Sequence, residues 1–369
     1  MENCNNEARF MALILGIESS CDETAAAVVE DGRKVVSNVV ASQIAKHSPY
    51  GGVIPELAAR EHLTAIGPVV DQALKDAGIT PADLSAVAVT HAPGLVPALL
   101  IGMTFAKGFA IANNLPLIGI NHFLGHIYGA FVGEDAPYKF DDPALYPMLA
   151  AVVSGGHTSL VVLTPDGKSH LVGTTLDDAA GEAFDKAAKL LDLGYPGGPI
   201  IERLAKNGRT DAHHFPRSLT GAAGKPVAPE NRFNFSFSGL KTSLLYLVRD
   251  MGGADKLSEE QLYDCLASYQ EAIVDVLCTK IFDAAKQYRV KSVVLCGGVA
   301  CNGALRERFE QRVPKNLIAL TAPKKYCTDN AAMIGGLASF YHRSGAYNAL
   351  DLDAQARLPL STELPFSLR

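Results

Sequence analysis

A strand–turn–strand pattern that occurs twice constrains the fold of this chain more than any other feature. Residues 13–32 read LILGIESSCDETAAAVVEDG, in which two apolar strands flank a small polar turn and an Asp-Gly turn follows. Residues 149–167, LAAVVSGGHTSLVVLTPDG, repeat that order. The repeat predicts two related halves, each of which begins with a hairpin whose turn faces a cleft. The alternative is a chance similarity between two ordinary hairpins.

Further strands and helices alternate along the chain. Apolar runs predict strands near 87–90, 117–120 and 292–296. Apolar residues at helical spacing predict helices at about 54–77, 97–113, 181–191, 258–288 and 330–342. Strands that alternate with helices are typical of an α/β protein with mixed sheets.

Composition limits the class of protein. Of the 369 residues 48% are apolar and the mean hydropathy is +0.12, which excludes a disordered chain. The length allows two or three domains that each bury a core. The net charge of −6 gives no general attraction to nucleic acid, so RNA binding would need a local basic surface.

Three observations predict a soluble cytoplasmic protein that does not cross a membrane. The seven cysteines include no CxxC pair, which is typical of a reducing compartment. The N-terminal sequence MENCNNEARF lacks the apolar stretch of a secretory signal. Between Asp83 and Glu134 the only formal charge is Lys107, but prolines and asparagines divide this segment into pieces shorter than a membrane span. We therefore expect a buried β-α-β unit there.

His122 and His126, in NHFLGHI, form a candidate pair of metal ligands. Their spacing places both imidazoles on one face of a helix. The HExxH pattern of zinc proteases is absent, because no glutamate lies between them. Asp329, in YCTDNAAM, precedes the last helix and could be the third ligand. Its alternative role is to cap that helix, which Asn330 could do equally well.

The two hairpin turns carry different chemistry. Three acids and three hydroxyls crowd the first turn, where acids could position a cation or accept a proton. The residues of this turn are Glu18, Ser19, Ser20, Cys21, Asp22, Glu23 and Thr24. The second turn offers small residues and N–H donors that suit a phosphate or acyl phosphate, together with His157. Gly297 and Gly298 follow a strand and could also present N–H groups to a phosphate, although a plain strand-to-helix connection is the favoured interpretation.

Two further segments have two interpretations each. Residues 206–232 carry five Lys or Arg against two acids, so they form either a solvated loop or a contact for RNA phosphates. In FNFSFSGLKT, the alternation of Phe233, Phe235 and Phe237 favours a buried strand edge over a platform for base stacking.

The ordered motifs closely resemble those of the TsaD family, the tRNA threonylcarbamoyladenosine transferases. The motifs are GIESSCDET, YGGVIPELAAREH, PGLV, NHFLGH, VSGGHTSL, AGEAFDKAAKLL, YPGGP, FNFSFSGLKT, GGVACNGALR and CTDNAAM, and they extend from about Ala12 to His342. The resemblance implies an actin-like ATPase (ASKHA) fold, with two RNase H-like lobes and mixed sheets around a central nucleotide cleft. It also implies transfer of a threonylcarbamoyl group from threonylcarbamoyl-adenylate to the adenosine beside the anticodon of tRNAs that read codons beginning with adenine.

Carried over to this sequence, the resemblance implies a set of site residues. The metal ligands are His122, His126 and Asp329, with one divalent metal per subunit, iron as the expected metal and zinc as the alternative. The candidate catalytic residue is Asp22. The adenylate or ATP in the cleft is bound by Val152, Val153, Ser154, Gly155, Gly156, Asp185, Gly198 and Asn302. The implied partners are tRNA and proteins of the TsaB and TsaE types.

The resemblance also implies a division of the chain. It comprises an N-terminal extension 1–11, a first lobe 12–137 with the histidines near its end, a second lobe 138–324 that includes the basic insertion 206–232, a closing helix 325–345 that returns to the first lobe, and a tail 346–369.

This sequence departs from the family pattern at a few positions. Ala92 and Pro97 replace glycines of a GPGLxG motif, and a proline at this position suits the start of a helix. Leu124 stands where bacterial relatives often have glutamate, which weakens a metalloprotease alternative. A small-molecule kinase of the same superfold would usually have Asp-Gly-Thr where this chain has Glu18. A nucleotide-gated binding module would need no histidine pair.

Overall fold

The computed structural model describes residues 11–221, 226–358 and 363–368, so the expected N-terminal extension 1–11 lies almost wholly outside the described residues. The first half contains a five-stranded sheet with the order β3-β2-β1-β4-β5. Its strands are β1 (Leu13–Glu18), β2 (Glu23–Glu30), β3 (Lys34–Ser42), β4 (Ala86–Ala92) and β5 (Leu117–Asn121). The central strand β1 pairs antiparallel with β2 and parallel with β4.

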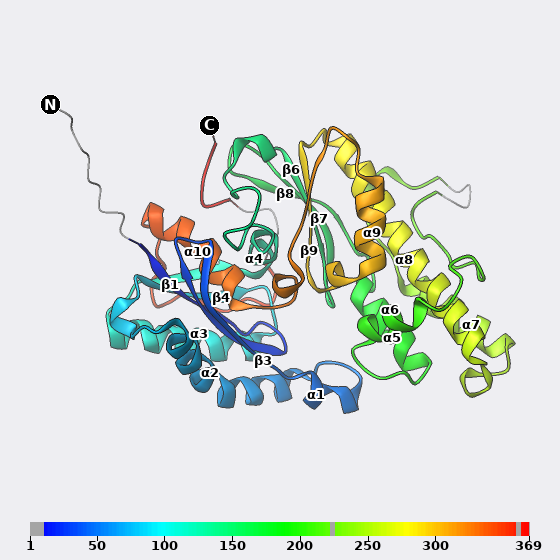
Figure 1. Ribbon diagram of the computed structural model, residues 1–369, viewed down its shortest axis with the longest axis horizontal. Coiled ribbons are helices and arrows are strands. Elements are labelled where there is room, and N and C mark those ends of the chain that lie inside the picture. The colour runs from blue at the N-terminus through cyan, green and yellow to red at the C-terminus, as the bar shows by residue number, and fades with distance from the viewer. Residues whose placement is uncertain (1–10, 222–225, 359–362, 369) are drawn as a thin grey trace.

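The second half contains a sheet of the same topology. Its order is β10-β9-β6-β7-β8, and the central strand β6 pairs antiparallel with β7 and parallel with β9. The strands are β6 (Met148–Val153), β7 (Thr158–Leu163), β8 (Ser169–Thr174), β9 (Ser292–Cys296) and β10 (Ile318–Thr321). Both predicted hairpins, β1–β2 and β6–β7, are therefore confirmed, and the matching strand orders confirm that the two halves repeat one design. Figure 1 shows the two sheets next to each other.

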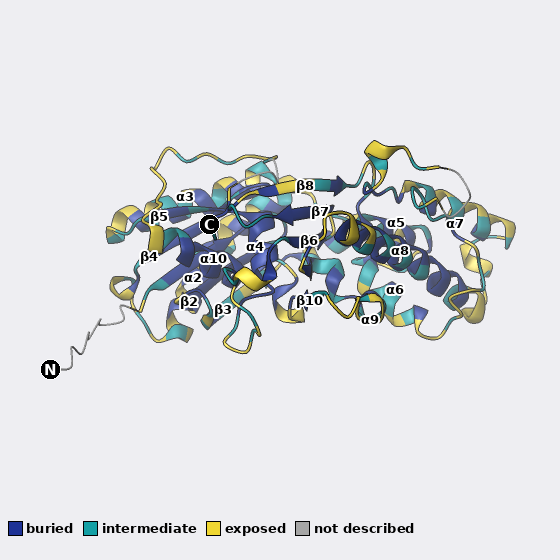
Figure 2. Cartoon of the chain, turned by 90° about the horizontal axis from the view of Figure 1, so that it is seen from above, coloured by how far each residue is buried: buried dark blue, intermediate teal, exposed yellow. Residues whose placement is uncertain are grey.

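Helices cover both faces of the first sheet. On one face α2 (Pro55–Ala77) and α3 (Val96–Asn113) pack against β2 and β4, and on the other α10 (Ala331–Ser344) crosses β1 and β2. Side chains alternate between the two faces of the sheet along β1. Leu15 and Ile17 therefore pack in the core under α2 and α3, whereas Ile14 packs in the core under α10. Figure 2 shows how little of β2 and β4 is exposed between these layers.

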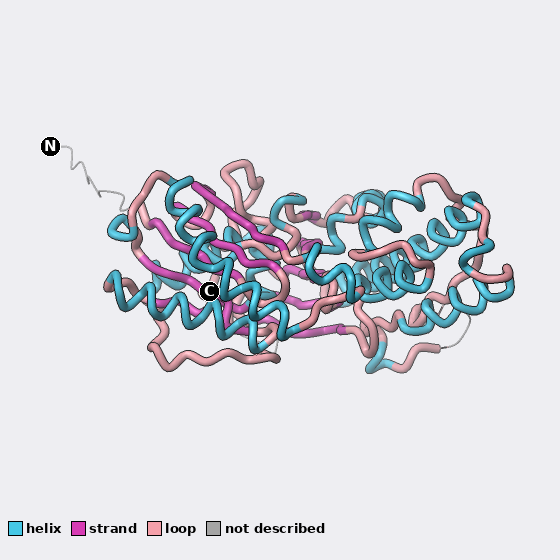
Figure 3. Tube along the Cα trace, turned by 90° about the horizontal axis from the view of Figure 1, so that it is seen from below, coloured by secondary structure: helices cyan, strands magenta, loops and turns pink. Residues whose placement is uncertain are grey.

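In the described part of the second half there are five α-helices. They are α5 (Ala180–Leu190), α6 (Gly197–Ala205), α7 (Ser238–Asp250), α8 (Glu259–Gln287) and α9 (Gly303–Arg312). The long helix α8 begins at a capping box in which Ser258 and Gln261 exchange hydrogen bonds. It packs against α6, α7 and α9, and most of its residues are buried. Figure 3 shows helices joined by loops, without strands, at the end of the molecule away from the N-terminus.

The apolar segment before Glu134 forms the expected β-α-β unit, in which α3 connects the parallel strands β4 and β5. Among the described residues, α3 is the one helix with the length and apolar composition of a membrane span, and 33% of its residues are buried. The unit is therefore less buried than expected: α3 packs on α2 and β4 while its outer face exposes Leu100 and Ile111.

Two other expectations can be compared with the structure. Most of the described part of 206–232 consists of turns and irregular chain, with one short 3-10 helix at Pro229–Asn231. Phe233, Phe235 and Phe237 are buried, as expected, but the strand is wrong: Phe235 makes one isolated bridge to Thr175 and the chain then enters α7. Because α7 begins at Ser238, the extended segment ends directly after Phe237.

Close backbone contact fixes α10 on the first sheet. A Cβ atom at Gly16 of β1 would collide with the carbonyl of Ala331 and lie 2.5 Å from the nitrogen of Gly335. Glycine therefore allows the helix backbone to approach the strand directly. Because Asp329 lies just before α10, this contact also sets the position of its carboxylate relative to β1.

Candidate metal centre

The two candidate histidines lie on α4 (His122–Tyr128), a short helix that directly follows β5. The helix begins at His122 because the side chain of Asn121 accepts hydrogen bonds from Phe123 N at 2.9 Å and Leu124 N at 3.2 Å. His122 and His126 are both buried, and their rings meet edge to face with centroids 4.5 Å apart. The predicted spacing on one helix face is thus confirmed.

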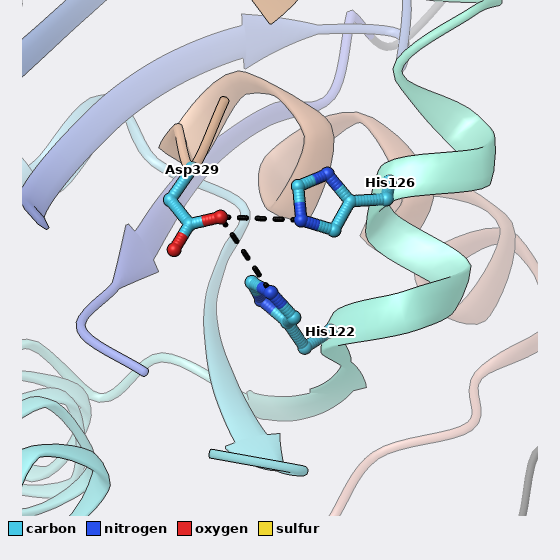
Figure 4. A group of neighbouring side chains, drawn as sticks. All are labelled: His122, His126 and Asp329. Carbon is cyan, nitrogen blue, oxygen red and sulfur yellow. Dashed lines mark ion pairs between the residues drawn. The ribbon is translucent and has the colours of Figure 1, made fainter. Parts of the chain in front are cut away.

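Asp329 is distant from these histidines in the sequence but lies next to them in the structure. Its Oδ1 lies 3.1 Å from His126 Nε2 and 3.6 Å from His122 Nε2, as Figure 4 shows. The alternative that Asp329 caps the last helix is wrong, since the side chain of Asn330 caps α10 by accepting from Met333 N at 3.1 Å. Asp329 is therefore available to face the histidines.

The donor set fits a metal cation. One ligand atom from each of His122, His126 and Asp329 lies within 4.8 Å of the others. Nδ1 of His126 is buried without a hydrogen-bond partner among the described residues, which is rare for a buried polar atom, and Nε2 faces Asp329 at 3.1 Å. Two imidazoles and one carboxylate are a common ligand set for divalent transition metals. A bound cation would satisfy the nitrogen of His126 that faces Asp329.

Electrostatics at this centre favour charged groups. Burial raises the pKa of Asp329, but His122 and His126 outweigh it and lower that pKa to about 2. Burial lowers the pKa of His122, but the charges of Glu18 and Asp329 outweigh it and raise that pKa to about 9. The carboxylates thus attract positive charge, from protons or from a metal, and the two compete for the same nitrogens.

The first turn, between β1 and β2, is tightly held and lies beside the histidines. Three consecutive carbonyl oxygens each accept a hydrogen bond from a different element: Ser20 O from Leu95 N at 2.8 Å, Cys21 O from His62 Nε2 at 3.0 Å, and Asp22 O from Gln43 N at 3.0 Å. Sequence reasoning missed His62, which is fully buried on α2; its place in the AREH run of an apolar helix face was the available signal. These bonds fix the backbone that carries Asp22.

The second turn, between β6 and β7, is open. A Cβ atom on Gly155 or Gly156 would meet nothing within 4 Å, so space remains in front of the backbone. The N-terminus of α5 supports the turn from behind, because Gly181 N donates to Ser154 O at 3.2 Å. The ring of His157 packs edge to face on Phe123 of α4, with centroids 4.5 Å apart. The second turn therefore lies next to the helix that carries the histidine pair.

The remaining candidate residues lie on the helices of the second half, Asp185 on α5, Gly198 on α6 and Asn302 at the start of α9. Asp185 Oδ1 accepts from Gly197 N at 2.7 Å, and burial, helped by the negative charge of Asp22, raises the pKa of Asp185 to about 6. Gly198 has open space in front of it. Asn302 caps α9 through Leu305 N at 3.0 Å and also donates to Gln270, so both ends of its side-chain amide already serve the fold.

The basic segment 206–232 uses part of its charge internally. Arg209 pairs with Asp264 at 2.6 Å and Arg217 with Asp275 at 3.5 Å. Such pairs reduce the positive charge that is available to RNA phosphates. The contact with RNA stays a prediction.

Comparisons with known proteins agree with this fold and site. The family model described as TsaD, tRNA N6-adenosine threonylcarbamoyltransferase, matches residues 34–336. A protein of that name from Syntrophus aciditrophicus is 49% identical over 349 residues, which cover 94% of this chain and 98% of the relative. One from Listeria monocytogenes is 46% identical over 351 residues, 94% of this chain and 96% of the relative.

Solved structures of distant proteins share the architecture. Full-length HypF in its phosphate- and nucleotide-bound form has a TM-score of 0.55 at 12% identity, covering 91% of this chain and 47% of HypF. Component A of (R)-2-hydroxyglutaryl-CoA dehydratase from Acidaminococcus fermentans has a TM-score of 0.50 at 15% identity, covering 90% of this chain and 99% of component A. These likenesses confirm the actin-like ATPase fold. Together with the match to the family model, the long alignments to curated relatives show that this chain belongs to the TsaD family of tRNA N6-adenosine threonylcarbamoyltransferases.

Proposed function

We propose that this chain transfers the threonylcarbamoyl group of threonylcarbamoyl-adenylate to the exocyclic amine of the adenosine next to the anticodon, in tRNAs that read codons beginning with adenine. Relatives that are 46–49% identical over at least 94% of the chain carry the name of this activity. The observation that carries the proposal is the group formed by His122, His126 and Asp329 beside the two hairpin turns. A kinase would have no evident use for that group.

We assign one divalent metal to His122, His126 and Asp329. Two histidines and one carboxylate suit iron(II), with zinc as the alternative. When bound, the metal would polarise the carbonyl of the threonylcarbamoyl group and make its carbon more electrophilic. The Nε2 of His126 supports this assignment, because it is buried and faces the carboxylate of Asp329 at 3.1 Å.

The second turn is assigned to the adenylate, or to ATP in its place. The buried strand end Val152–Val153 carries Ser154, Gly155 and Gly156 into the space between the halves. The absence of side chains at the glycines leaves their N–H groups accessible to a phosphate. Asp185, Gly198 and Asn302 complete the assigned nucleotide site. Since the side chain of Asn302 is engaged in the fold, we expect it to act through its position and backbone.

Asp22 is assigned to the attacking amine. The new bond forms between the amine nitrogen and the carbonyl carbon, the bond from that carbon to the phosphate oxygen breaks, and AMP leaves with its electron pair. The amine loses a proton in this step, which Asp22 can accept or direct. The three hydrogen bonds that fix the backbone of the turn support a positioning role as well.

The wider assignments follow the family. The lobes comprise residues 12–137 and 138–324, with 325–345 closing onto the first lobe, and the contact of α10 with β1 supports that closure. We expect tRNA to bind at local basic surface such as 206–232, and proteins of the TsaB and TsaE types to assist. We place the protein in the cytoplasm, with no membrane partner.

Nucleoside analysis of tRNA tests the function. Purified protein is incubated with unmodified tRNA, threonylcarbamoyl-adenylate and the two partner proteins, and the tRNA is digested for mass spectrometry. We expect N6-threonylcarbamoyladenosine with the wild type and none with His122→Ala plus His126→Ala. No modified adenosine from the wild type, while a curated relative is active in parallel, would refute the function. Modification at the normal rate by the double variant would refute the metal assignment alone.

A further inference from the structure

Glu18, the last residue of β1, is a fully buried carboxylate next to the histidine pair. Its Oε1 accepts from Ser20 N at 2.6 Å. Its Oε2 accepts from Thr90 Oγ1 at 2.6 Å and contacts His122 Nδ1 at 3.0 Å. Burying a charged carboxylate costs folding free energy. A role beyond packing would explain why this chain keeps a carboxylate here.

We propose that Glu18 is the positioning residue of the metal centre, which holds the ring of His122 and fixes the nitrogen that it offers to a metal. This inference rests on the proposed function, because it assumes that His122, His126 and Asp329 bind the cation. It adds a residue outside that ligand set. The hydrogen bonds of Glu18 go to Ser20, Thr90 and His122, of which only His122 is an assigned ligand.

The hydrogen-bond chemistry determines which nitrogen of His122 is protonated. An ionised carboxylate can only accept, so the hydrogen between Glu18 Oε2 and His122 belongs to Nδ1. The hydroxyl of Ser20, 3.1 Å from the same nitrogen, can accept from it as well. In a neutral ring Nε2 then keeps its lone pair, and Nε2 is the atom that points toward Asp329. Glu18 therefore selects the tautomer that can bind a metal.

The contacts of Glu18 also fix the position of the ring. Thr90 lies on β4, Glu18 on β1 and His122 at the start of α4, so one carboxylate joins three elements. The hydroxyl of Thr90 and the N–H of Ser20 hold the carboxylate from two other directions. The carboxylate cannot rotate without losing one of these bonds. The ring of His122 is thus oriented before any metal arrives.

His126 provides an internal contrast. Its Nδ1 is buried and has no hydrogen-bond partner among the described residues. No carboxylate therefore selects its tautomer from behind, although it contributes to the same centre. The centre thus combines one ligand that is oriented in advance and one whose orientation depends on the metal and Asp329. Loss of Glu18 should weaken the first ligand specifically.

Metal titration of the full-length apoprotein tests this inference. Cobalt(II) is the probe, because its visible absorption reports binding directly, and the metal content after dialysis gives a second readout. Glu18→Gln keeps the shape but removes the charge, and we expect about tenfold to hundredfold weaker cobalt binding. Thr90→Val removes one hydrogen bond to Glu18 and should weaken binding less. Thr90→Ser keeps the hydroxyl and is the matched control, with wild-type affinity expected.

The outcomes separate the possible failures. If His122→Ala plus His126→Ala binds cobalt like the wild type, the proposed metal site itself is wrong. If that double variant loses cobalt but folded Glu18→Gln binds with wild-type affinity, the positioning role is refuted. If Glu18→Gln does not fold, Thr90→Val and Thr90→Ser decide, and equal cobalt affinity of these two variants refutes the role. Urea unfolding of each apoprotein shows whether a change in affinity is separate from a change in stability.

Discussion

The two hairpin turns occupy equivalent places in sheets of the same topology, yet they are built in opposite ways. In the first, Ser19, Ser20 and Asp22 are buried and the backbone is held by neighbours on several sides. In the second, Gly155 and Gly156 are exposed and open. The same sheet topology thus occurs twice, but the side chains make one turn buried and tightly held and leave the other open in front of its glycines.

The charge on the first turn should have the largest effect on activity. Asp22→Asn preserves size but removes the group assigned to the amine proton, so we expect transfer to slow by about 10² to 10⁴. Metal content should stay at the wild-type level, since Asp22 is not among the assigned ligands. Single-turnover transfer to tRNA and elemental analysis measure the two quantities. A wild-type rate would mean that the first turn is only a scaffold.

The crowding around the first turn should appear in stability. A Cβ atom at Gly94 would lie 2.8 Å from both Cβ and the carbonyl oxygen of Ser20. Gly94→Ala must therefore displace that turn, and we expect a loss of about 1–3 kcal/mol in the free energy of unfolding. Urea denaturation measures it.

Gly108→Ala is the matched control for that experiment. Gly108 lies within α3, and a Cβ atom there would meet nothing within 4 Å. Alanine should therefore stabilise the helix by about 0.5–1 kcal/mol. Equal effects of the two substitutions would show that the first turn is not tightly packed.

Asp185, in the second half, should reveal its buried charge through pH. Its pKa is raised from 3.8 to about 6, chiefly by burial, so folding favours the protonated form. The stability that this group contributes is fully present below about pH 4 and is lost as the pH rises through about 6. Asp185→Asn should therefore raise the free energy of unfolding by about 2 kcal/mol at pH 7.5 and change it little at pH 3. The same gain at both pH values would contradict this explanation.

The open second turn should give the smallest effect. Gly155→Ala meets no neighbouring atom, so the midpoint of thermal unfolding should not change. A methyl group in front of the backbone should nevertheless hinder the assigned phosphate and raise KM for the adenylate about threefold to tenfold, with kcat little changed. Steady-state kinetics with varied adenylate decide the matter. A large loss of stability would show that this turn is as constrained as the first.

Local patterns predicted most of the central architecture. The strand at Ser292–Cys296 has the expected bounds, and α2 differs from its expected start by one residue. The edge strands β3 and β8 were not predicted, because partial exposure dilutes their apolar pattern. Helix α6 begins within YPGGP, which on local grounds favours a turn.

The candidate site was predictable in part. The sequence alone gives the four-residue spacing of His122 and His126. It also shows that either Asp329 or Asn330 could cap the last helix, but it does not decide between them. The contacts of Glu18 with Thr90 and His122 could not be predicted, because they depend on how strands and helices far apart in the chain pack together. Burial of a charge is a tertiary property that no local pattern encodes.

The close approach of α10 to β1 has a consequence for biosynthesis. The ribosome makes the chain from its N-terminus, so His122 and His126 exist long before Asp329 and the helix that follows it. Until that helix emerges, the face of the first sheet that it covers is open and the proposed metal centre lacks its third ligand. If the proposed centre binds a metal, its retention would report that synthesis has passed Asp329 and that α10 has docked. A nascent chain that stops earlier has no complete centre.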